Sequence, residues 1–137
     1  MKHHTKTKGD LGVLKAQADL AEQGFTVLLP LTEHAPFDLV IYSIESGFQT
    51  VQVKYRSLKS GTITVNFKST WNDKSGTHIV KMNKDYVDIV CIYIPETGYC
   101  YYLKPKDFGE SVTLRVETPK NNQIENIHLA SDYRRVP

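Results

Sequence analysis

Two runs of β-branched and aromatic residues in the first half of the chain place the tightest constraint on its fold. They cover residues 37–42 and 50–55, and a cluster of turn-forming residues, Glu45-Ser46-Gly47, lies between them. β-Branched and aromatic side chains pack well on a pleated sheet, and two runs of them separated by a short turn are typical of two antiparallel strands. We therefore expect a β-hairpin whose register decides which polar side chains come together.

Three polar residues of this hairpin are expected on one face. A turn centred on Ser46 sets Asp38 opposite Lys54 and Val40 opposite Gln52. Residues that lie opposite each other point to the same face, and side chains alternate along each strand. One face of the hairpin is therefore predicted to carry a carboxylate, an amide and an ammonium group.

This set of functional groups suits phosphodiester hydrolysis. The reaction needs an activated water, neutralisation of charge on the phosphate and help for the departing oxygen, and magnesium ions held by carboxylate and carbonyl oxygens supply all three. A lysine adds a positive charge that needs no metal. The plainer interpretation is an exposed ion pair between Asp38 and Lys54, which would stabilise the fold by about 0.2–1 kcal/mol. The residue types alone leave both interpretations open.

Four short segments follow one another along the first part of the chain. They are Lys8-Gly9-Asp10-Leu11-Gly12, Glu22-Gln23-Gly24-Phe25-Thr26-Val27-Leu28, Pro30-Leu31-Thr32-Glu33-His34-Ala35-Pro36-Phe37-Asp38-Leu39-Val40 and Val51-Gln52-Val53-Lys54. In order and spacing this series resembles the PD-(D/E)xK nucleases, in particular the branch of cyanobacterial group I intron-encoded homing endonucleases. The resemblance runs from Lys8 to about Arg56, with a looser similarity over residues 88–103.

The resemblance implies a role for each polar residue of the hairpin. Asp38 would bind a divalent metal ion, and Lys54 would polarise the phosphate or the attacking water. Gln52 occupies the place of the usual second acid, and its amide oxygen can bind a hard cation without adding negative charge. The backbone carbonyl of Val53 would complete the metal shell. The implied ion is Mg²⁺, with Mn²⁺ as a substitute.

The chain departs from this family in its first predicted helix. Many relatives carry a glutamate just after the second glycine, where this chain has Val13. Asp10 lies three residues earlier on the same side of the helix start and is a candidate for supporting the metal. Its simpler role is that of an N-cap, and the two roles are compatible.

A basic stretch begins directly at the predicted site. Between residues 56 and 81 five residues are basic and only Asp73 is acidic, whereas the whole chain has a net charge of only +2. Clusters of lysine and arginine make phosphate contacts, although a solvated loop can have the same composition. His34 is a further candidate for lining a DNA cleft. The candidate DNA-binding residues are Arg56, Lys59, Lys68, Lys74 and Lys81.

Length and composition predict a single domain over residues 1–137. The chain has 40% hydrophobic and 23% charged residues, which supplies enough apolar material for a core. Residues 1–8 are expected to be flexible, and His3 and His4 are excluded from the site. The order of elements suits an α+β or α/β fold, and the resemblance implies a restriction-endonuclease-like core in which helices flank a central mixed β-sheet.

Periodicity and turn residues predict the other elements of the fold. Leu14 is expected on the core face of the first helix. Cys91 and Cys100 lie in apolar strand contexts and are expected to be free core thiols. The expected elements are a helix over 10–23, strands over 25–31 and 62–70, a mobile polar loop over 71–77, a hairpin of strands 89–94 and 99–103, a short helix at 105–108, an edge strand over 112–116, a polar connection at 119–123 and a last helix over 126–133.

Together these features predict a magnesium-dependent, site-specific endonuclease that makes double-strand breaks in a long DNA target. Because one chain carries one site, such breaks need a homo-oligomer, a dimer or a tetramer. Residues 62–81 are the candidate DNA reader. No apolar leader or membrane span is evident, so a cytoplasmic location without membrane contact is expected. The alternatives are a Holliday-junction-type or restriction-like nuclease, a catalytically silent DNA-binding module of the same fold, and a plain interaction domain.

Overall fold

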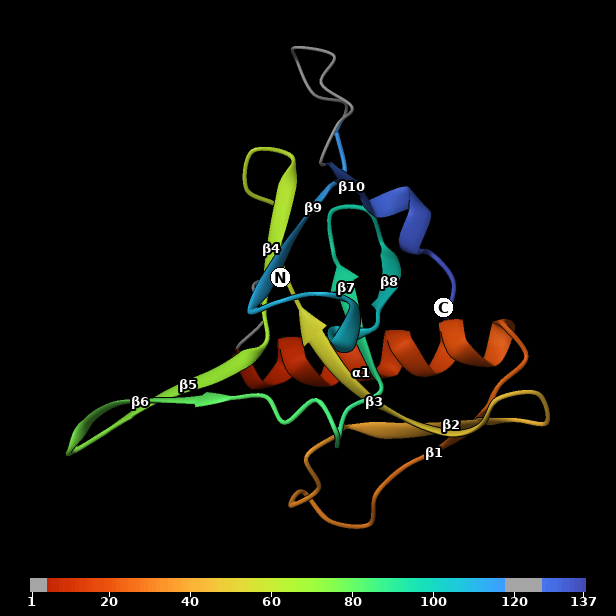
Figure 1. The fold of residues 1–137 in the computed structure, drawn as a ribbon, viewed down its shortest axis with the longest axis horizontal. Coiled ribbons are helices and arrows are strands. Elements are labelled where there is room, and N and C mark those ends of the chain that lie inside the picture. Colours follow the sequence, from red (N-terminus) through yellow and green to blue (C-terminus); the bar gives the residue numbers. More distant parts are fainter. Residues whose placement is uncertain (1–4, 118–126) are drawn as a thin grey trace.

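A mixed sheet of five strands forms the centre of the molecule. The structure is a computed structural model and describes residues 5–117 and 127–137. The strand order is β1-β2-β3-β7-β8, in which β3 and β7 are parallel and the other neighbours are antiparallel. The predicted mixed sheet is thereby confirmed. The strands are β1 Thr26–Leu28, β2 Leu39–Ser43, β3 Gly47–Tyr55, β7 Ile89–Ile94 and β8 Tyr99–Leu103 (Figure 1).

Helix α1 packs on one face of the central sheet. It spans Thr5–Glu22 and begins earlier than the predicted start at residue 10. Its buried residues join those of β2, β3, β7 and β8 in one apolar cluster. Residues 5–8, predicted to be flexible, form the first turn of this helix. Because Asp10 lies inside the helix, the N-cap role predicted for it is wrong.

Two small residues, Gly12 and Ala16, lie on the side of α1 that faces the sheet. Gly12, Ala16 and Leu20 are buried and lie four residues apart, on one side of the helix. A Cβ atom on Gly12 would lie 3.4 Å from Val53 Cγ1, so the helix backbone approaches β3 closely at this point. Leu14, predicted to be buried, is 61% exposed instead. Close backbone approach has therefore overridden side-chain size in orienting the helix.

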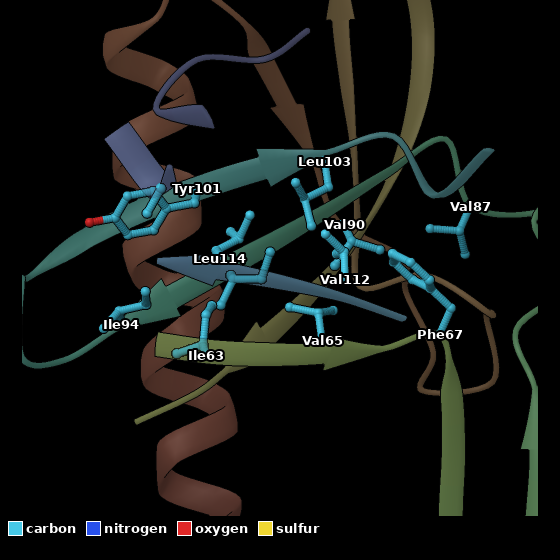
Figure 2. Packing of buried hydrophobic residues seen from close by; sticks show 12 residues of the cluster. Ile63, Val65, Phe67, Val87, Val90, Ile94, Tyr101, Leu103, Val112 and Leu114 are labelled. Atoms are coloured by element: carbon cyan, nitrogen blue, oxygen red, sulfur yellow. The ribbon is translucent and has the colours of Figure 1, made fainter. Parts of the chain in front are cut away.

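A second, three-stranded sheet covers the other face of β7 and β8. Its order is β10-β9-β4, with β4 at Thr62–Asn66, β9 at Ser111–Arg115 and β10 at His128–Leu129. The prediction of an edge strand over 112–116 is wrong, because β9 pairs on both sides. Figure 2 shows the apolar cluster between the two sheets, in which Ile63, Val65 and Leu114 from the small sheet pack against residues of β7 and β8.

The segment predicted as a polar loop at 71–77 is a β-hairpin. Strands β5, Lys68–Asp73, and β6, Gly76–Lys81, pair in an antiparallel register. Figure 1 shows this hairpin projecting from the rest of the molecule. Its turn is short, and Ser75 N–H and Oγ–H both donate to Asp73 Oδ1, at 2.8 Å and 2.6 Å. The turn-forming residues identified in the sequence thus connect two strands and do not continue as a loop.

The hairpin of β7 and β8 has the bounds predicted for it. Every residue of β7 is buried, because the strand packs on α1 at one face and on the small sheet at the other. Cys91 pairs with Tyr102, and both Cys91 and Cys100 are buried free thiols, as predicted.

Two short 3₁₀ helices, η1 Pro105–Asp107 and η2 Ala130–Tyr133, replace the predicted helices at 105–108 and 126–133. The predicted connection at 119–123 lies outside the described residues. Within the described ranges, no helix combines the length and the apolar character needed to cross a membrane.

Candidate active site

The hairpin of β2 and β3 has a different register from the predicted one. Val40 lies opposite Thr50 and not opposite Gln52, so the register is displaced by two residues. The reason is the turn: Gly47 adopts φ 68° and pairs with Ser43, which leaves three residues, 44–46, as the loop. A displacement of two residues preserves the alternation of side chains. The residues predicted to share a face still share it.

Asp38 lies just before β2 and is held against β3 by two hydrogen bonds. Its backbone N–H donates to the Val51 carbonyl at 2.9 Å, and its carboxylate Oδ2 accepts the Val53 N–H at 2.7 Å. Asp38 is exposed on one side, yet partial burial raises the pKa of its carboxyl group, against the lowering effects of the Val53 hydrogen bond and the Lys54 charge. The hydrogen bond to β3 therefore fixes where this carboxylate can act.

Gln52 and Lys54 lie on β3 with their side chains on the face opposite α1. Val51 and Val53 alternate with them and belong to the apolar cluster under the helix. The Gln52 Oε1 atom is buried and has no hydrogen-bond partner among the described residues. An orphaned acceptor of this kind is costly and is typical of a position that holds a ligand or an ion.

Lys54 carries a strongly perturbed ammonium group. Burial, followed by the nearby charge of Arg56, lowers the pKa of Lys54 to about 8, while the charge of Asp38 acts in the opposite direction. The described residues show no ion pair between Lys54 and Asp38. The simple cross-strand ion pair considered from the sequence is therefore absent, and Lys54 is available to a phosphate.

A cavity of about 340 Å³ opens beside these residues. Asp38, just before β2, and Gln52 on β3 line one part of it, and the end of β6 and the segment that follows line another. The complete lining is Ala35, Pro36, Asp38, Gln52, Val80, Lys81, Met82, Asn83, Tyr86 and Val87.

Hydrogen bonds anchor the far wall of this cavity to β3. Thr50 Oγ1–H donates to the Tyr86 carbonyl at 2.8 Å, and Thr50 N–H donates to Asp88 Oδ2 at 2.9 Å. The Asp88 N–H donates in return to the Thr50 carbonyl at 3.1 Å. Asn83 and Tyr86 were missed from the sequence, because only tertiary packing brings their segment beside the hairpin.

The donor set for a divalent cation is small. No group of three His, Cys, Asp or Glu side chains that could hold a metal occurs in the described part of the chain. The Asp38 carboxylate and the orphaned Gln52 oxygen are nevertheless the hard oxygen donors that Mg²⁺ and Mn²⁺ accept, and these two residues line one cavity. The residues present therefore fit a divalent ion that brings its remaining ligands from water, substrate or a backbone carbonyl such as that of Val53.

The first helix does not add a carboxylate to this donor set through any contact in the structure. Asp10 is exposed on α1, which packs on the other face of the sheet, and no hydrogen bond or ion pair joins it to Asp38, Gln52 or Lys54 in the described residues. Val13 is half-buried and packs against the apolar cluster under the helix.

The predicted DNA-binding residues fall into separate groups around the site. Arg56 and Lys59 line one cavity of about 360 Å³, and Lys68 and Lys81 line another of about 450 Å³. Lys81 also lines the cavity of Asp38 and Gln52. Lys74 is exposed in the turn of the projecting β5–β6 hairpin (Figure 1). The structure thus brings Lys81 to the site directly, and Arg56 lies near it because it directly follows the strand of Lys54.

The chain is similar to known proteins in both sequence and fold. A model of the PD-(D/E)XK endonuclease family matches residues 3–136. The chain is similar to a solved structure of a bacterial homing endonuclease, I-Ssp6803I, with a TM-score of 0.76 and 26% sequence identity, over 96% of this chain and 89% of that chain. No curated protein matches the chain. The predicted restriction-endonuclease-like α+β fold is thereby confirmed.

Proposed function

The chain belongs to the PD-(D/E)XK endonuclease family and is a DNA endonuclease, and from this premise we propose that it makes magnesium-dependent, site-specific double-strand breaks. The proposal is supported by the cavity that Asp38 and Gln52 share, by the buried Gln52 oxygen that has no partner in the described residues, and by Lys54 on the same face of β3. An intron-encoded homing role is supported by the similarity to a homing endonuclease.

Asp38 and Gln52 form the proposed metal site. Bound there, a divalent ion would activate water and neutralise phosphate charge. The Val53 N–H keeps the Asp38 carboxylate beside β3, and the raised pKa of this carboxylate reflects burial that a cation would offset. Gln52 contributes an oxygen without a second negative charge, which makes the metal affinity weaker than that of a two-carboxylate site.

Lys54 is the proposed electrostatic catalyst. With a pKa of about 8, it is mainly protonated near neutral pH. A partly desolvated ammonium stabilises charge on the scissile phosphate more strongly than one in water, and the fixed strand needs little reorganisation to present it. Its charge does not depend on metal occupancy.

The test is selection from a pool of long randomised duplexes, with and without magnesium, using the native protein and Lys54→Ala. The bound and cut molecules are sequenced separately. We expect cleavage at one long motif by the native chain only, with binding largely retained by the variant because many contacts share the affinity. Cleavage of junction DNA without a long motif would instead favour a structure-selective nuclease.

A second candidate is a catalytically silent DNA-binding module, favoured by the single carboxylate among the proposed metal ligands. This candidate predicts that the selected motif is bound and is never cut, with or without magnesium. The same selection therefore separates the two candidates.

The proposed DNA reader is the segment from β4 through the β5–β6 hairpin, residues 62–81. The hairpin projects from the body (Figure 1), as a two-stranded ribbon must if it is to enter a major groove. Lys68 and Lys74 are exposed on it. If they contact phosphates, each alanine substitution should reduce the slope of log Kd against log salt concentration by about 1.

A homo-oligomer is proposed because one chain presents one site. Phe48 is 69% and Leu28 is 41% exposed, and the registers of β1–β2 and β2–β3 place both on the face that carries Asp38, over strands that the small sheet does not cover. The Tyr42 and Phe48 rings lie 4.7 Å apart on this face. No lysine or arginine occurs between residues 16 and 53, so this surface suits a second copy of the chain and not DNA.

A further inference from the structure

The turn that joins β3 to β4 has an unusual backbone. Ser60 and Gly61 have φ values of 51° and 75°, and Lys59 and Thr62 exchange backbone hydrogen bonds of 2.9 Å and 3.1 Å across them. Positive φ at both central residues is the pattern of a type I′ turn. A serine in this region costs roughly 1–2 kcal/mol, and such strain is concentrated at functional sites.

Contacts from two other segments hold this turn in place. The Leu58 N–H donates to Glu96 Oε1 at 2.8 Å, and the Val116 N–H donates to the Gly61 carbonyl at 2.9 Å. A Cβ atom on Gly61 would lie 2.9 Å from Glu117 Oε2, so the turn is packed closely against its neighbours. The side chains of Lys59 and Thr62 are therefore presented from a fixed backbone.

The cavity beside this turn is lined mainly by cations and hydrogen-bond donors. It has a volume of about 360 Å³, and none of its lining residues is acidic. Glu96 is occupied by the Leu58 N–H and does not line it. The Thr62 Oγ1–H donates to the Lys59 carbonyl at 3.1 Å, and the Thr64 and Thr113 hydroxyls share a bond of 3.0 Å, so the groups that remain for an anion include the side chains of Arg56 and Lys59 and the Asn66 amide. Two basic side chains with an amide donor, and no carboxylate in the lining, are the chemistry of an anion site. The lining residues are Arg56, Ser57, Lys59, Thr62, Ile63, Thr64 and Asn66.

This cavity lies next to the proposed catalytic lysine. Arg56 follows Lys54 by two residues, so extended backbone separates their Cα atoms by roughly 7 Å and directs both side chains to one face. Arg56 Nη1–H donates to the Tyr55 carbonyl at 2.8 Å, and the Arg56 N–H donates to the Tyr93 carbonyl at 3.0 Å. These bonds fix the base of the guanidinium group beside Lys54.

We propose that the cavity of Arg56 and Lys59 binds a non-scissile backbone phosphate of the DNA strand that is cut, adjacent to the phosphate held by Lys54. The inference rests on the proposed function, since the ligand is the substrate of the same site. Held at two consecutive phosphates, the strand would be positioned for attack without any base contact. The bound anion would also relieve the repulsion between Arg56 and Lys54.

The test is a scan of single neutral methylphosphonates through the strand on either side of the cleaved bond. Binding is measured without added divalent metal for the native protein, Arg56→Gln and Lys59→Gln, with Lys106→Gln as the control, because Lys106 is exposed and Asp85 is its one ion-pair partner in the described part of the chain. We expect one flanking methylphosphonate to weaken native binding by about tenfold, as loss of a charge-assisted contact does. The same modification should have little further effect on Arg56→Gln.

Three outcomes separate the possibilities. If Arg56→Gln and every methylphosphonate weaken binding independently, no phosphate occupies this cavity and the inference is overturned. If Lys59→Gln, which keeps the backbone hydrogen bonds of the turn, also makes binding insensitive to the one flanking position, the inference stands even if Arg56→Gln is poorly folded by circular dichroism. If the native protein neither binds nor cuts any duplex, the proposed function fails, and this inference fails with it.

Discussion

The substitution Gln52→Met should stabilise the protein and at the same time remove its response to magnesium. Gln52 Oε1 is buried without a hydrogen-bond partner in the described residues, and leaving such an acceptor unpaired costs about 1–3 kcal/mol. Methionine has a similar volume and no strong acceptor, so the cost is removed while the packing is preserved. Because Gln52 is only half-buried, we expect a gain near the lower end, about 1 kcal/mol.

The gain converts into a measurable change in melting temperature. An unfolding entropy of about 2.1 cal/mol/K per residue gives about 0.29 kcal/mol/K for 137 residues, so 1 kcal/mol raises Tm by about 3.5 °C. Native protein should show a further rise of Tm in magnesium, by mass action on the folded state. Gln52→Met should not show this rise, since the substitution removes a proposed metal ligand.

Scanning calorimetry with EDTA or with magnesium measures both effects. Gln49→Met is the matched control, since Gln49 lies on the same strand, is also half-buried and lies outside the cavity of Asp38. Two results would refute the assignment of this amide to the metal site. One is a Tm of Gln52→Met in EDTA that is lower than that of the native protein, and the other is a rise of Tm in magnesium as large as that of the native protein.

Other consequences can be measured with equal directness. Burial lowers the pKa of Lys54 to about 8, and the proposed catalyst is its ammonium form. We therefore expect kcat/KM to fall about tenfold per pH unit above pH 8 while circular dichroism shows the chain to be folded, and a profile flat to pH 10 would contradict this role. Phe48→Asp should lower the molar mass in analytical ultracentrifugation to that of a monomer, whereas an unchanged oligomer would exclude this face as the interface. Gly61→Ala should lower Tm by about 4–7 °C, equivalent to roughly 1–2 kcal/mol, because a φ of 75° suits glycine. The control Gly109→Ala should leave Tm nearly unchanged, since a Cβ atom there would meet open space.

The sequence predicted which side chains of the hairpin share a face but not how its strands are paired. Alternation along a strand has a fixed period of two, so Gln52 and Lys54 had to lie on one side. The register depended on whether Gly47 lies in the turn or in the strand, and its positive φ decided this in a way that composition does not reveal. Similarly, Leu14 was assigned to the core by hydrophobicity, whereas Gly12 allowed the helix backbone to approach β3 more closely.

Features that depend on contacts between distant segments were not predictable from local patterns. Tyr86 reaches the site only because Thr50 binds its carbonyl, and the three-stranded sheet forms because β4 and β9 pair across more than forty residues. The family resemblance of residues 8–56, by contrast, was contained in short ordered motifs and is confirmed by the match over residues 3–136.

The proposed active site is tested by strand cleavage of the selected duplex, labelled at both 5′ ends, by the native protein and Lys54→Ala under single-turnover conditions. We expect the native protein to cut both strands only when a divalent metal is present, and Lys54→Ala to bind within about tenfold of the native affinity without cutting. Cleavage by Lys54→Ala at the native rate, or tight binding by the native protein without cleavage in magnesium or manganese, would contradict the proposed active site.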